Sequence, residues 1–507
     1  MAENSSNLKS PRAKKTMEKA KIKSGSPFLR SQSGERPSKP TTPLQRSSYI
    51  PPWSEPYIIG VAGNSGSGKT SVSQRIIQEL NQPWTVLLSF DNFYKPLNKK
   101  EREIAFKNEY DFDMPTSLDL DLLVNTVKSL KRGEKTEIPV YSFEHHNRTS
   151  KTTTIYGANV IIIEGIYALY DSRLLDLMDI KIYIDTALDV CLARRLTRDI
   201  LYRGRDLPGA LKQWETFVKP NAVRYVSPTM LKANLVIPRG MDNQIAINLM
   251  IKHIQKQLLI KSYAHLKNLK ELGLRQEFKV QQFRNIKLLP ETNHTRGINS
   301  ILFNKRSERA DFIFYFDRIA ILIIEGALEF LTNFKKKEIL TPTQEVFHGV
   351  CQDDEIIAVN VIRSGDCFMN AIKKTFPEIS IGKLLIQSDS LTGEPQLHTD
   401  SLPKDLISKK VFLFDAQIIS GAAAIMAIQV LIDHGAKEED MVVCSYLSTE
   451  IGLKRILNVF PHVKLVLGKL SSGETCKIYP WYNQEKFLDT DWHFRNRFID
   501  SLYFGTN

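Results

Sequence analysis

The sequence predicts an α/β protein with two consecutive domains, each built on a parallel sheet covered by helices. Strand-like apolar runs alternate with stretches of helical periodicity, which is the pattern of parallel sheets. A glycine-rich loop joins the first such strand to the first helix. The chain has 507 residues, more than one ordinary core accommodates. Its 42% apolar and 25% charged residues are typical of a globular protein.

The glycine-rich loop carries the first chemical signal. Residues 63–70 read GNSGSGKT, which is the P-loop pattern G-x-x-x-x-G-K-[ST] between an apolar run and an amphipathic stretch. Its backbone N–H groups cradle phosphates at the start of a helix. We expect Lys69 to reach the β- and γ-phosphates of a nucleoside triphosphate and Thr70 to bind Mg²⁺. The expected nucleotide-binding residues are Gly63, Asn64, Ser65, Gly66, Ser67, Gly68, Lys69, Thr70 and Ser71.

The alternating pattern also predicts where the elements and domains lie. In the first domain we expect strands at 57–62, 85–89, 159–163, 181–185 and 233–237, and a closing helix from about 244 to 259. In the second we expect a long apolar helix at 312–331 and strands at 356–361, 383–387, 410–414, 441–445 and 464–467. The predicted organisation is a tail (1–52), a P-loop domain (53–262), a linker (263–290) and a second α/β domain (291–507).

Charge and cysteine usage exclude several classes of protein. The net charge is +13, but residues 1–50 hold eleven Lys and Arg against three Glu, so nucleic acid is not an expected partner. We expect this basic tail to be a disordered, solvated extension; the alternatives are phosphorylation sites or a nuclear address. The longest apolar stretch, 319–331, is too short to span a membrane. Five scattered cysteines without a C-x-x-C pair favour a reducing, cytoplasmic setting without zinc.

Two acidic residues follow predicted strands, where parallel sheets bind ligands. Asp91 is placed to accept a proton from an attacking hydroxyl or to hold Mg²⁺ through water; the alternative is a helix N-cap. Glu164 ends an apolar strand downstream of the P-loop, which is typical of a metal-side carboxylate; the alternative is a surface turn acid.

Clustered arginines suit phosphoryl transfer, because guanidinium groups neutralise charge on the transferred oxygens. Arg194, Arg195 and Arg198 lie within about one helical turn, and Arg203 and Arg205 follow. We expect Arg198 and Arg203 to act in catalysis. A solvated basic helix face is the alternative.

Six more motifs then follow the P-loop in unbroken order within residues 55–260. They read DNFY (91–94), FDMP (112–115), IPVYSF (138–143), EGIYAL (164–169), RRLTRDILYRGRD (194–206) and IPRG (237–240). Together they resemble the uridine-cytidine kinase family, whose relatives among P-loop kinases share the loop but not the middle motifs. The resemblance implies transfer of phosphate from ATP or GTP, with Mg²⁺, to the 5′-hydroxyl of uridine and cytidine in pyrimidine salvage.

The resemblance also implies residue roles. Asp91 would be the base for the ribose 5′-hydroxyl, and Asp113 would bind the ribose hydroxyls. Tyr141 and His146 would contact the pyrimidine, with Phe143 beside it, which suits a flat heterocycle. The remaining expected contacts are Arg195, Arg205 and Gln213 to the nucleoside and Asp242 to the nucleotide. Only the spacing from Tyr141 selects His146 over its neighbour His145.

Residues 295–507 resemble uracil phosphoribosyltransferase. The matching motifs are FIFYFDR (312–318), VIRSG (361–365), VFLFD (411–415) with SG (420–421), and FGT (504–506). The family's phosphate loop reads roughly D-P-M-L-A-T-G-G-S, whereas residues 415–423 read DAQIISGAA, so the second glycine and the hydroxyl after it are absent. An arginine expected near Phe303 is absent, and residues 497–501 do not match the family's G-D-x-G-D.

These departures favour a second domain that keeps the fold without the transferase reaction. Two alternatives remain: a bifunctional kinase and uracil phosphoribosyltransferase, and a non-catalytic nucleotide-binding scaffold. Intact Lys69, Thr70, Asp91, Asp113 and Glu164 argue against a scaffold. The kinase resemblance further implies a homo-oligomer, most simply a tetramer, with neither nucleic acid nor membrane as a partner.

Overall fold

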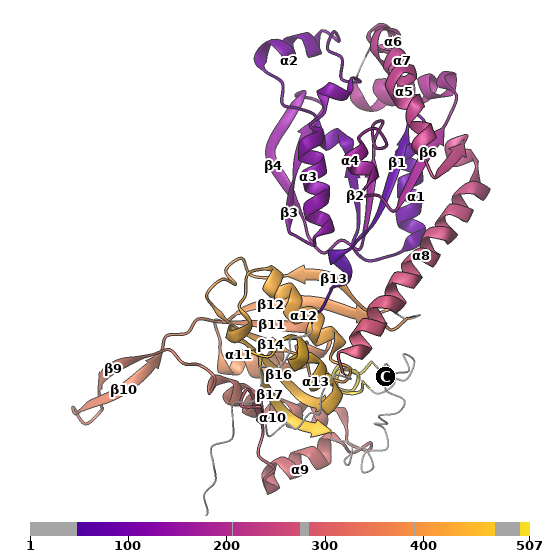
Figure 1. Cartoon of the computed structure of the whole chain (residues 1–507). Helices are drawn as coiled ribbons and strands as arrows, with labels where there is room; N and C mark the ends of the chain where they lie inside the picture. The colour runs from indigo at the N-terminus through magenta and orange to yellow at the C-terminus, as the bar shows by residue number, and fades with distance from the viewer. Residues whose placement is uncertain (1–47, 205, 274–282, 390–391, 472–496, 507) are drawn as a thin grey trace, which may run out of the picture. The chain divides into compact units, whose positions relative to one another are not determined.

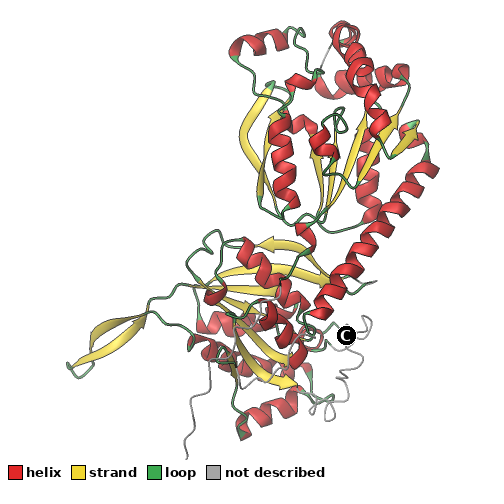
Figure 2. Cartoon of the chain, viewed as in Figure 1, coloured by secondary structure: helices red, strands yellow, loops and turns green. Residues whose placement is uncertain are grey.

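The structure is a computed structural model that describes residues 48–204, 206–273, 283–389, 392–471 and 497–506. Contacts group Leu44–Asn507 into one compact unit. That unit contains two large sheets formed by different parts of the chain (Figures 1 and 2). The predicted α/β class, with a parallel kinase-type sheet followed by a second α/β region, is confirmed.

The first sheet is parallel throughout, with the strand order β2-β5-β1-β6-β7. Its strands are β1 (Tyr57–Gly63), β2 (Thr85–Ser89), β5 (Val160–Glu164), β6 (Ile180–Asp185) and β7 (Leu235–Pro238). The accompanying helices are α1 (Lys69–Leu80), α2 (Lys99–Phe106), α3 (Leu120–Lys131), α4 (Ser172–Leu175), α5 (Leu188–Arg203), α6 (Leu207–Gln213), α7 (Lys219–Asn221) and α8 (Gln244–Glu271). All five predicted strands are present, with ends that differ by no more than two residues.

Both faces of this sheet are buried, which explains why its strands read as continuous apolar runs. On one face, Ile59 and Ile162 pack against Val72 and Ile76 of α1 and Ile251 of α8. On the other face, the sheet packs against α3. The predicted apolar side of α1 is confirmed, with Val72, Ile76 and Leu80 buried and Ile77 half-buried.

A hairpin that the sequence prediction missed lies between α3 and β5. Its strands, β3 (Thr136–Ser142) and β4 (Asn147–Ile155), are antiparallel, with Tyr141 opposite Arg148. The polar, threonine-rich β4 is mostly exposed, so it lacks the apolar run used to recognise strands. This hairpin carries part of the predicted nucleoside site.

Helix α8 extends past residue 259, where we expected it to end, into a segment that we expected to be helical or linking. Helix α8 continues without a break to Glu271, so the first residues of the predicted linker are helical. No glycine or proline interrupts residues 244–271, and Gly273 is the first breaker. Later in the same linker, β8 (Ile286–Leu288) joins the second sheet by pairing with β17 (Lys464–Ser471).

The second large sheet has the order β13-β12-β11-β14-β16-β17-β8, and only β13 is antiparallel to its neighbour. Its other strands are β11 (Ile356–Ile362), β12 (Ser380–Ser388), β13 (Pro395–Ser401), β14 (Lys410–Phe414), β15 (Gln417–Ile418) and β16 (Met441–Thr449). The helices are α9 (Asn293–Leu302), α10 (Arg309–Leu328), α11 (Met369–Thr375), α12 (Ala422–Asp433), α13 (Glu450–Val459) and α15 (Ile499–Phe504). The long apolar helix predicted at 312–331 is α10, and it begins and ends three residues earlier.

The second sheet is also covered on both faces. Helices α12 and α13 pack on one face through residues such as Ile425 and Ile456. Helices α9, α10 and α15 cover the other through Ile298, Ile323 and Ile499. The predicted burial of the 319–331 stretch is therefore confirmed for its inward side.

A separate two-stranded hairpin, β9 (Phe334–Leu340) with β10 (Val346–Gln352), joins neither sheet (Figure 1). Nearly every residue of both strands is exposed. The exposed side chains include six large apolar ones: Phe334, Ile339, Leu340, Val346, Phe347 and Val350. A hairpin of two strands is only marginally stable by itself, so this surface is suited to contact with another chain.

Most of the predicted tail lies outside the described residues, and with it the alternatives of phosphorylation sites or a nuclear address. Residues 48–52 are described and are not extended into solvent: Pro51 is buried and the Tyr49 hydroxyl lies 3.1 Å from His265 Nε2. Of the cysteines, Cys191, Cys367 and Cys444 are buried free thiols and Cys351 is an exposed one; Cys476 is outside the described residues. Among the described helices, none has the length and apolarity needed to cross a bilayer.

Candidate active site

Three neighbouring strands of the first sheet end at the same place. β1 ends at Gly63, β2 at Ser89 and β5 at Glu164, and β5 pairs with both of the others. Ligands of open parallel sheets bind just beyond such carboxyl ends. A pocket at this edge is lined by twelve predicted site residues: Ser65, Lys69, Thr70, Asp91, Asp113, Tyr141, Phe143, His146, Glu164, Arg195, Arg198 and Gln213.

The glycine-rich loop leads from β1 into α1, as predicted. Gly66 and Gly68 have φ values of 87° and 92°, which side-chain-bearing residues rarely adopt. A Cβ on Gly66 would lie 2.3 Å from the carbonyl oxygen of Cys191. The loop therefore needs glycine both for its conformation and for its packing, and α1 begins directly at Lys69.

Lys69 lies inside the loop, where its Nζ donates to the Asn64 carbonyl at 2.9 Å. Burial lowers the pKa of Lys69 to about 8, although Glu164 and Asp91 oppose the shift. Among the described residues this is the one hydrogen bond that the buried ammonium group makes, and it could be exchanged for a bond to a phosphate oxygen.

Thr70 and Glu164 form the oxygen-rich side of the pocket. Thr70 Oγ1 donates to Glu164 Oε1 at 3.1 Å, while Glu164 Oε2 is buried without a hydrogen-bond partner among the described residues. Burial raises the pKa of Glu164, and the nearby Lys69 counteracts it. Glu164 is only 6% exposed, so the surface-turn alternative is wrong.

Asp91 lies in a 3₁₀ turn (Phe90–Phe93) directly after β2 and points into the same pocket. Ser89 caps this turn by accepting from the Asp91 backbone N–H at 3.3 Å. Because Ser89 is the cap, the alternative that Asp91 serves as an N-cap is wrong. The Asp91 carboxylate is near enough to Lys69 to affect its pKa.

Arg195 connects the phosphate loop to the opposite side of the pocket. Its Nη1 donates to Ser65 Oγ at 3.0 Å and lies 3.6 Å from Asp113 Oδ1. Buried Asp199 pairs with Arg195 at 3.4 Å and with Arg198 at 2.9 Å, which orients both guanidinium groups. The solvated-face alternative is therefore wrong for Arg195, which is 9% exposed.

Aromatic side chains form the far end of the pocket. The ring of Tyr141, on β3, lies 5.2 Å from Tyr94 and 5.4 Å from Phe143. His146, at the hairpin turn, stacks on Phe112 at 5.1 Å with a 24° interplanar angle. His145 is exposed and does not line the pocket. Of the two neighbouring histidines, it is therefore His146, the one selected by its spacing from Tyr141, that lies in the pocket.

Asp113 and Gln213 are positioned by neighbours that the sequence prediction did not name. The Asp113 backbone N–H donates to Asp111 Oδ1 at 3.0 Å, and the Tyr167 hydroxyl donates to the Asp113 carbonyl. Gln213 Nε2 donates to Asn108 Oδ1 at 3.1 Å. Both predicted side chains line the pocket opposite the phosphate loop.

The prediction missed five aromatic lining residues: Phe90, Tyr94, Tyr110, Phe112 and Phe217. Tyr94 and Phe112 belong to the DNFY and FDMP motifs, in which only Asp91 and Asp113 were expected to contact a ligand. Tyr110 precedes the second of these motifs, and its ring lies 4.7 Å from Phe112. Phe217 lies in a π-helical turn (Trp214–Val218) for which the sequence offers no local signal.

Several predicted residues do not line this pocket. Asp242 is exposed and lies 3.4 Å from Arg194, beside a turn whose Gly240 packs against Ser67 of the phosphate loop. Arg203 is the last residue of α5, but its side chain is not described, and Arg205 lies outside the described residues. Six further residues of the glycine-rich segment belong to the loop or its flanks but do not line the pocket: Gly63, Asn64, Gly66, Ser67, Gly68 and Ser71.

The second sheet carries a comparable loop after β14, but protein side chains cover it. Asp415 is buried, and burial raises its pKa against the influence of Arg497. Arg497 Nη2 lies 3.5 Å from Asp415 Oδ2 and donates to the Gln417 carbonyl at 3.1 Å. The next backbone N–H, of Phe498, donates to Gln417 Oε1 at 3.2 Å. The chain's own C-terminal segment therefore lies on the beginning of this loop.

Phe303, near which the family resemblance calls for an arginine, packs against the same C-terminal segment. The ring of Phe303 lies 6.3 Å from that of Phe498 and 6.0 Å from that of Tyr446. An apolar cluster therefore stands where the family resemblance calls for a cation.

Comparisons with known proteins agree with both halves of this description. Residues 58–246 match the Phosphoribulokinase / Uridine kinase family, and residues 289–475 match Uracil phosphoribosyltransferase. The chain is 53% identical over 464 residues to a Saccharomyces cerevisiae protein named uridine kinase, which covers 90% of each chain. It is 40% identical to a Schizosaccharomyces pombe uridine kinase, with 84% of this chain and 93% of the relative covered. A Mus musculus protein named uridine-cytidine kinase-like 1 is 39% identical, with coverage of 85% and 82%.

The lowered pKa of Lys69 predicts how triphosphate binding depends on pH. Below pH 8 Lys69 is charged in the empty pocket, and a bound polyanion favours that charged form. The affinity for ATP in the presence of EDTA should therefore fall as the pH rises above about 8, by at most about tenfold per pH unit. Isothermal titration calorimetry between pH 7 and 9.5 measures this.

Lys69→Met is the control, because it removes the titrating group. Its weaker binding should change little with pH over the same range. An equally steep decrease in the variant would show that another group titrates.

Proposed function

We propose, from the premise that this chain belongs to the phosphoribulokinase/uridine kinase family, that it phosphorylates the 5′-hydroxyl of uridine and cytidine to give UMP and CMP in pyrimidine salvage. The observation that carries the proposal is a single pocket that contains both a phosphate loop and an aromatic subsite. Asp91 lies in the same pocket as both. Such a pocket suits direct transfer between two bound substrates.

The donor is ATP, or GTP, with Mg²⁺. The residues present fit this cation, because Thr70 and Glu164 offer hydroxyl and carboxylate oxygens, and one Glu164 oxygen is buried without a partner. Within the described ranges, no group of three His, Cys, Asp or Glu side chains is placed to bind a metal by itself. The triphosphate would thus complete the coordination, and the cation would neutralise charge on the transferred phosphoryl group.

The chain's own groups supply proton transfer and charge stabilisation. Asp91 accepts the proton of the ribose 5′-hydroxyl as that oxygen attacks the γ-phosphorus and the bond from this phosphorus to the bridging oxygen of the diphosphate breaks. Asp91 is also assigned a water-mediated contact to Mg²⁺. Lys69 contacts the β- and γ-phosphates, and Arg198 and Arg203 stabilise the equatorial oxygens. Asp199 supports this by holding the Arg198 guanidinium. Asp242 completes the nucleotide contacts.

The acceptor end is assigned to the nucleoside. Asp113 binds the ribose hydroxyls, and Tyr141 and His146 contact the pyrimidine with Phe143 beside them. Arg195, Arg205 and Gln213 complete the nucleoside contacts. Stacked and edge-on rings with a few directed polar groups suit a small planar heterocycle. Free thiols at all four described cysteines support a reducing, cytoplasmic location.

Asp91→Asn tests the assigned base. The amide cannot accept the proton, so kcat for uridine should fall about 10²- to 10⁴-fold, while the Kd for ATP should stay within about twofold. Asp176→Asn, at an exposed position outside the pocket, is the matched control and should retain activity.

Unchanged turnover in Asp91→Asn would refute this role for Asp91. A purified wild-type chain that binds ATP but phosphorylates no nucleoside would instead favour the scaffold alternative. The nucleoside panel should contain uridine and cytidine, each assayed with ATP and with GTP.

The second half is assigned no transferase activity. The contacts of Arg497 and Phe498 with the loop after β14, and the apolar cluster at Phe303, support this assignment. We expect neither the wild type nor Lys69→Ala, which removes the kinase activity and keeps the second half intact, to form UMP from uracil and phosphoribosyl pyrophosphate above a blank without enzyme. Radiolabelled uracil and chromatographic separation measure it. A clear excess would establish the bifunctional alternative.

The homo-oligomer, a tetramer in the simplest case, is assigned in part to the β9–β10 hairpin. Its six exposed apolar side chains give a second copy of the chain a surface to bury. We expect Phe347→Ser combined with Val350→Ser to lower the mass measured by light scattering. Leu231→Ser, at a position 88% exposed elsewhere, is the control and should leave the mass unchanged. A wild-type monomer, or an unchanged mass in the double variant, would contradict this assignment.

A further inference from the structure

The base of the β3–β4 hairpin is held by the second half of the chain. β4 ends at Ile155, and the next residue, Tyr156, is 4% exposed. Tyr156 belongs to the hydrophobic cluster that contains α12, α13 and the inner face of the second sheet. The residue that directly follows the hairpin in the sequence is therefore buried in the core of the other half.

Polar and ring contacts fix this tyrosine. Its hydroxyl donates to Asp433 Oδ2 at 2.7 Å, and its ring packs edge-on against His434 at 4.8 Å. Trp53 Nε1 donates to the same Asp433 oxygen at 3.2 Å. Burial, and then the Asp433 charge, raise the pKa of Tyr156, so the hydroxyl remains a donor at all physiological pH values. Asp400 pairs with His434 at 3.1 Å and orients that ring.

The other end of the same hairpin forms the aromatic end of the candidate active site. Tyr141 lies on β3, while Phe143 and His146 lie in the turn. The paired strands run from Thr136 opposite Ile155 to Ser142 opposite Asn147. The register shifts between Pro139 and Tyr141, and pairing resumes with Tyr141 opposite Arg148, so two paired segments connect the base of the hairpin to its tip.

The first sheet also has backbone hydrogen bonds that do not involve Tyr156. Asn159, which follows Tyr156 closely, donates its backbone N–H to Trp84 and accepts from Tyr57 at the start of β2 and β1. These bonds fix β5 and therefore Glu164. The phosphate loop similarly depends on β1 and α1, so loss of the anchor affects the hairpin and spares the triphosphate end.

We propose that Tyr156 is a positioning residue through which the second half of the chain sets nucleoside affinity. The inference rests on the proposed function in assigning Tyr141 and His146 to the nucleoside. It gives the transferase-like half a role in the kinase reaction: its helix α12 holds the hairpin at the angle that completes the acceptor site.

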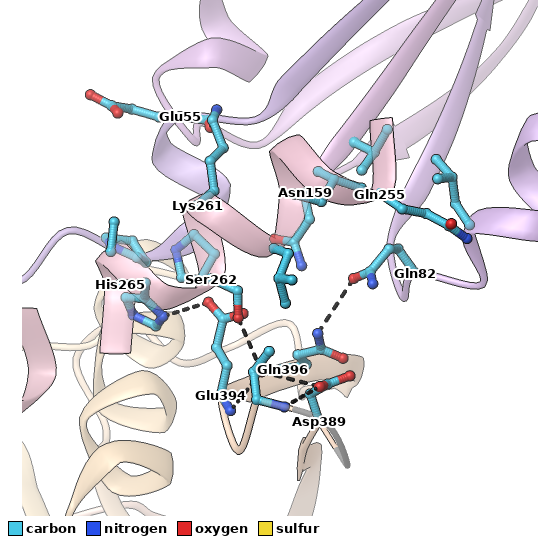
Figure 3. Close-up of a pocket in the computed structure, with 18 of the residues that line it drawn as sticks. Glu55, Gln82, Asn159, Gln255, Lys261, Ser262, His265, Asp389, Glu394 and Gln396 are labelled. Atoms are coloured by element: carbon cyan, nitrogen blue, oxygen red, sulfur yellow. Dashed lines mark hydrogen bonds and ion pairs between the residues drawn. The ribbon is translucent and has the colours of Figure 1, made fainter. Parts of the chain in front are cut away.

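A second contact between the same halves provides a matched control (Figure 3). His265 Nδ1, on α8, lies 2.6 Å from Glu394 Oε1, and Ser262 Oγ donates to Thr392 Oγ1 at 3.0 Å. His265 and Glu394 are both buried. This contact involves α8 and not the hairpin, so breaking it weakens attachment of the halves without acting on the acceptor site.

The test compares Tyr156→Ala, Tyr156→Phe, Asp433→Ala and Glu394→Gln in the full chain. We expect Tyr156→Ala to raise the KM for uridine about tenfold and to leave the KM for ATP within about twofold. Tyr156→Phe keeps the ring and should recover most of the affinity. Asp433→Ala, at a more exposed position, should show a smaller rise of the same kind. Glu394→Gln should lower the melting temperature and leave both KM values unchanged.

Hydrogen exchange of residues 136–155 provides a readout that does not depend on turnover. Faster exchange there in Tyr156→Ala, without faster exchange in α1, supports the proposal even if the chain acts on another acceptor. Equal effects on both KM values, an equal rise in Glu394→Gln, or unchanged exchange in the hairpin would overturn it. If Tyr156→Ala does not fold, the same comparison of KM values and of hydrogen exchange is made with Asp433→Ala. Absence of uridine phosphorylation by the wild type would instead contradict the proposed function.

Discussion

The candidate active site depends on the parallel pairing of β5 with β1 and β2. This pairing places Gly63, Ser89 and Glu164 at one edge of the sheet, although they are far apart in the sequence. The phosphate loop, the turn that carries Asp91 and the buried carboxylate all follow from it. Because both faces of the sheet are packed with helices, the strand ends have little freedom, and charged groups there can be held partly out of water.

Burial has opposite effects on the two central ionisable groups of this edge. It lowers the pKa of the Lys69 ammonium and raises that of the Glu164 carboxyl, while each charge favours the other. Both groups can accept further contacts. Among the described residues, Lys69 Nζ donates one hydrogen bond, to the Asn64 carbonyl, and Glu164 Oε2 has no hydrogen-bond partner. The proposed triphosphate and cation would supply the contacts that both groups lack.

The second half shows the same type of architecture with a different outcome at its strand ends. Its loop after β14 is contacted by Arg497 and Phe498 from the C-terminal segment, whereas the first loop is open to the pocket. The second half nevertheless buries Tyr156 and Trp53 of the first in its own core.

The sequence by itself determined the fold class, all five strands of the first sheet and five strands of the second, because apolar runs are local signals, but it missed β8, β13 and β15. Glycine spacing, likewise a local signal, marked the loop that leads into α1. Motif resemblance also selected Tyr141 and His146, both of which line the pocket. Only the tertiary structure decided that Phe90, Tyr94, Tyr110, Phe112 and Phe217 line the pocket and that α8 continues past the predicted boundary. It likewise decided that the polar strand β4 leads to an anchored Tyr156. These features depend on contacts between residues that are distant in the sequence. Periodicity within a single segment cannot predict such contacts.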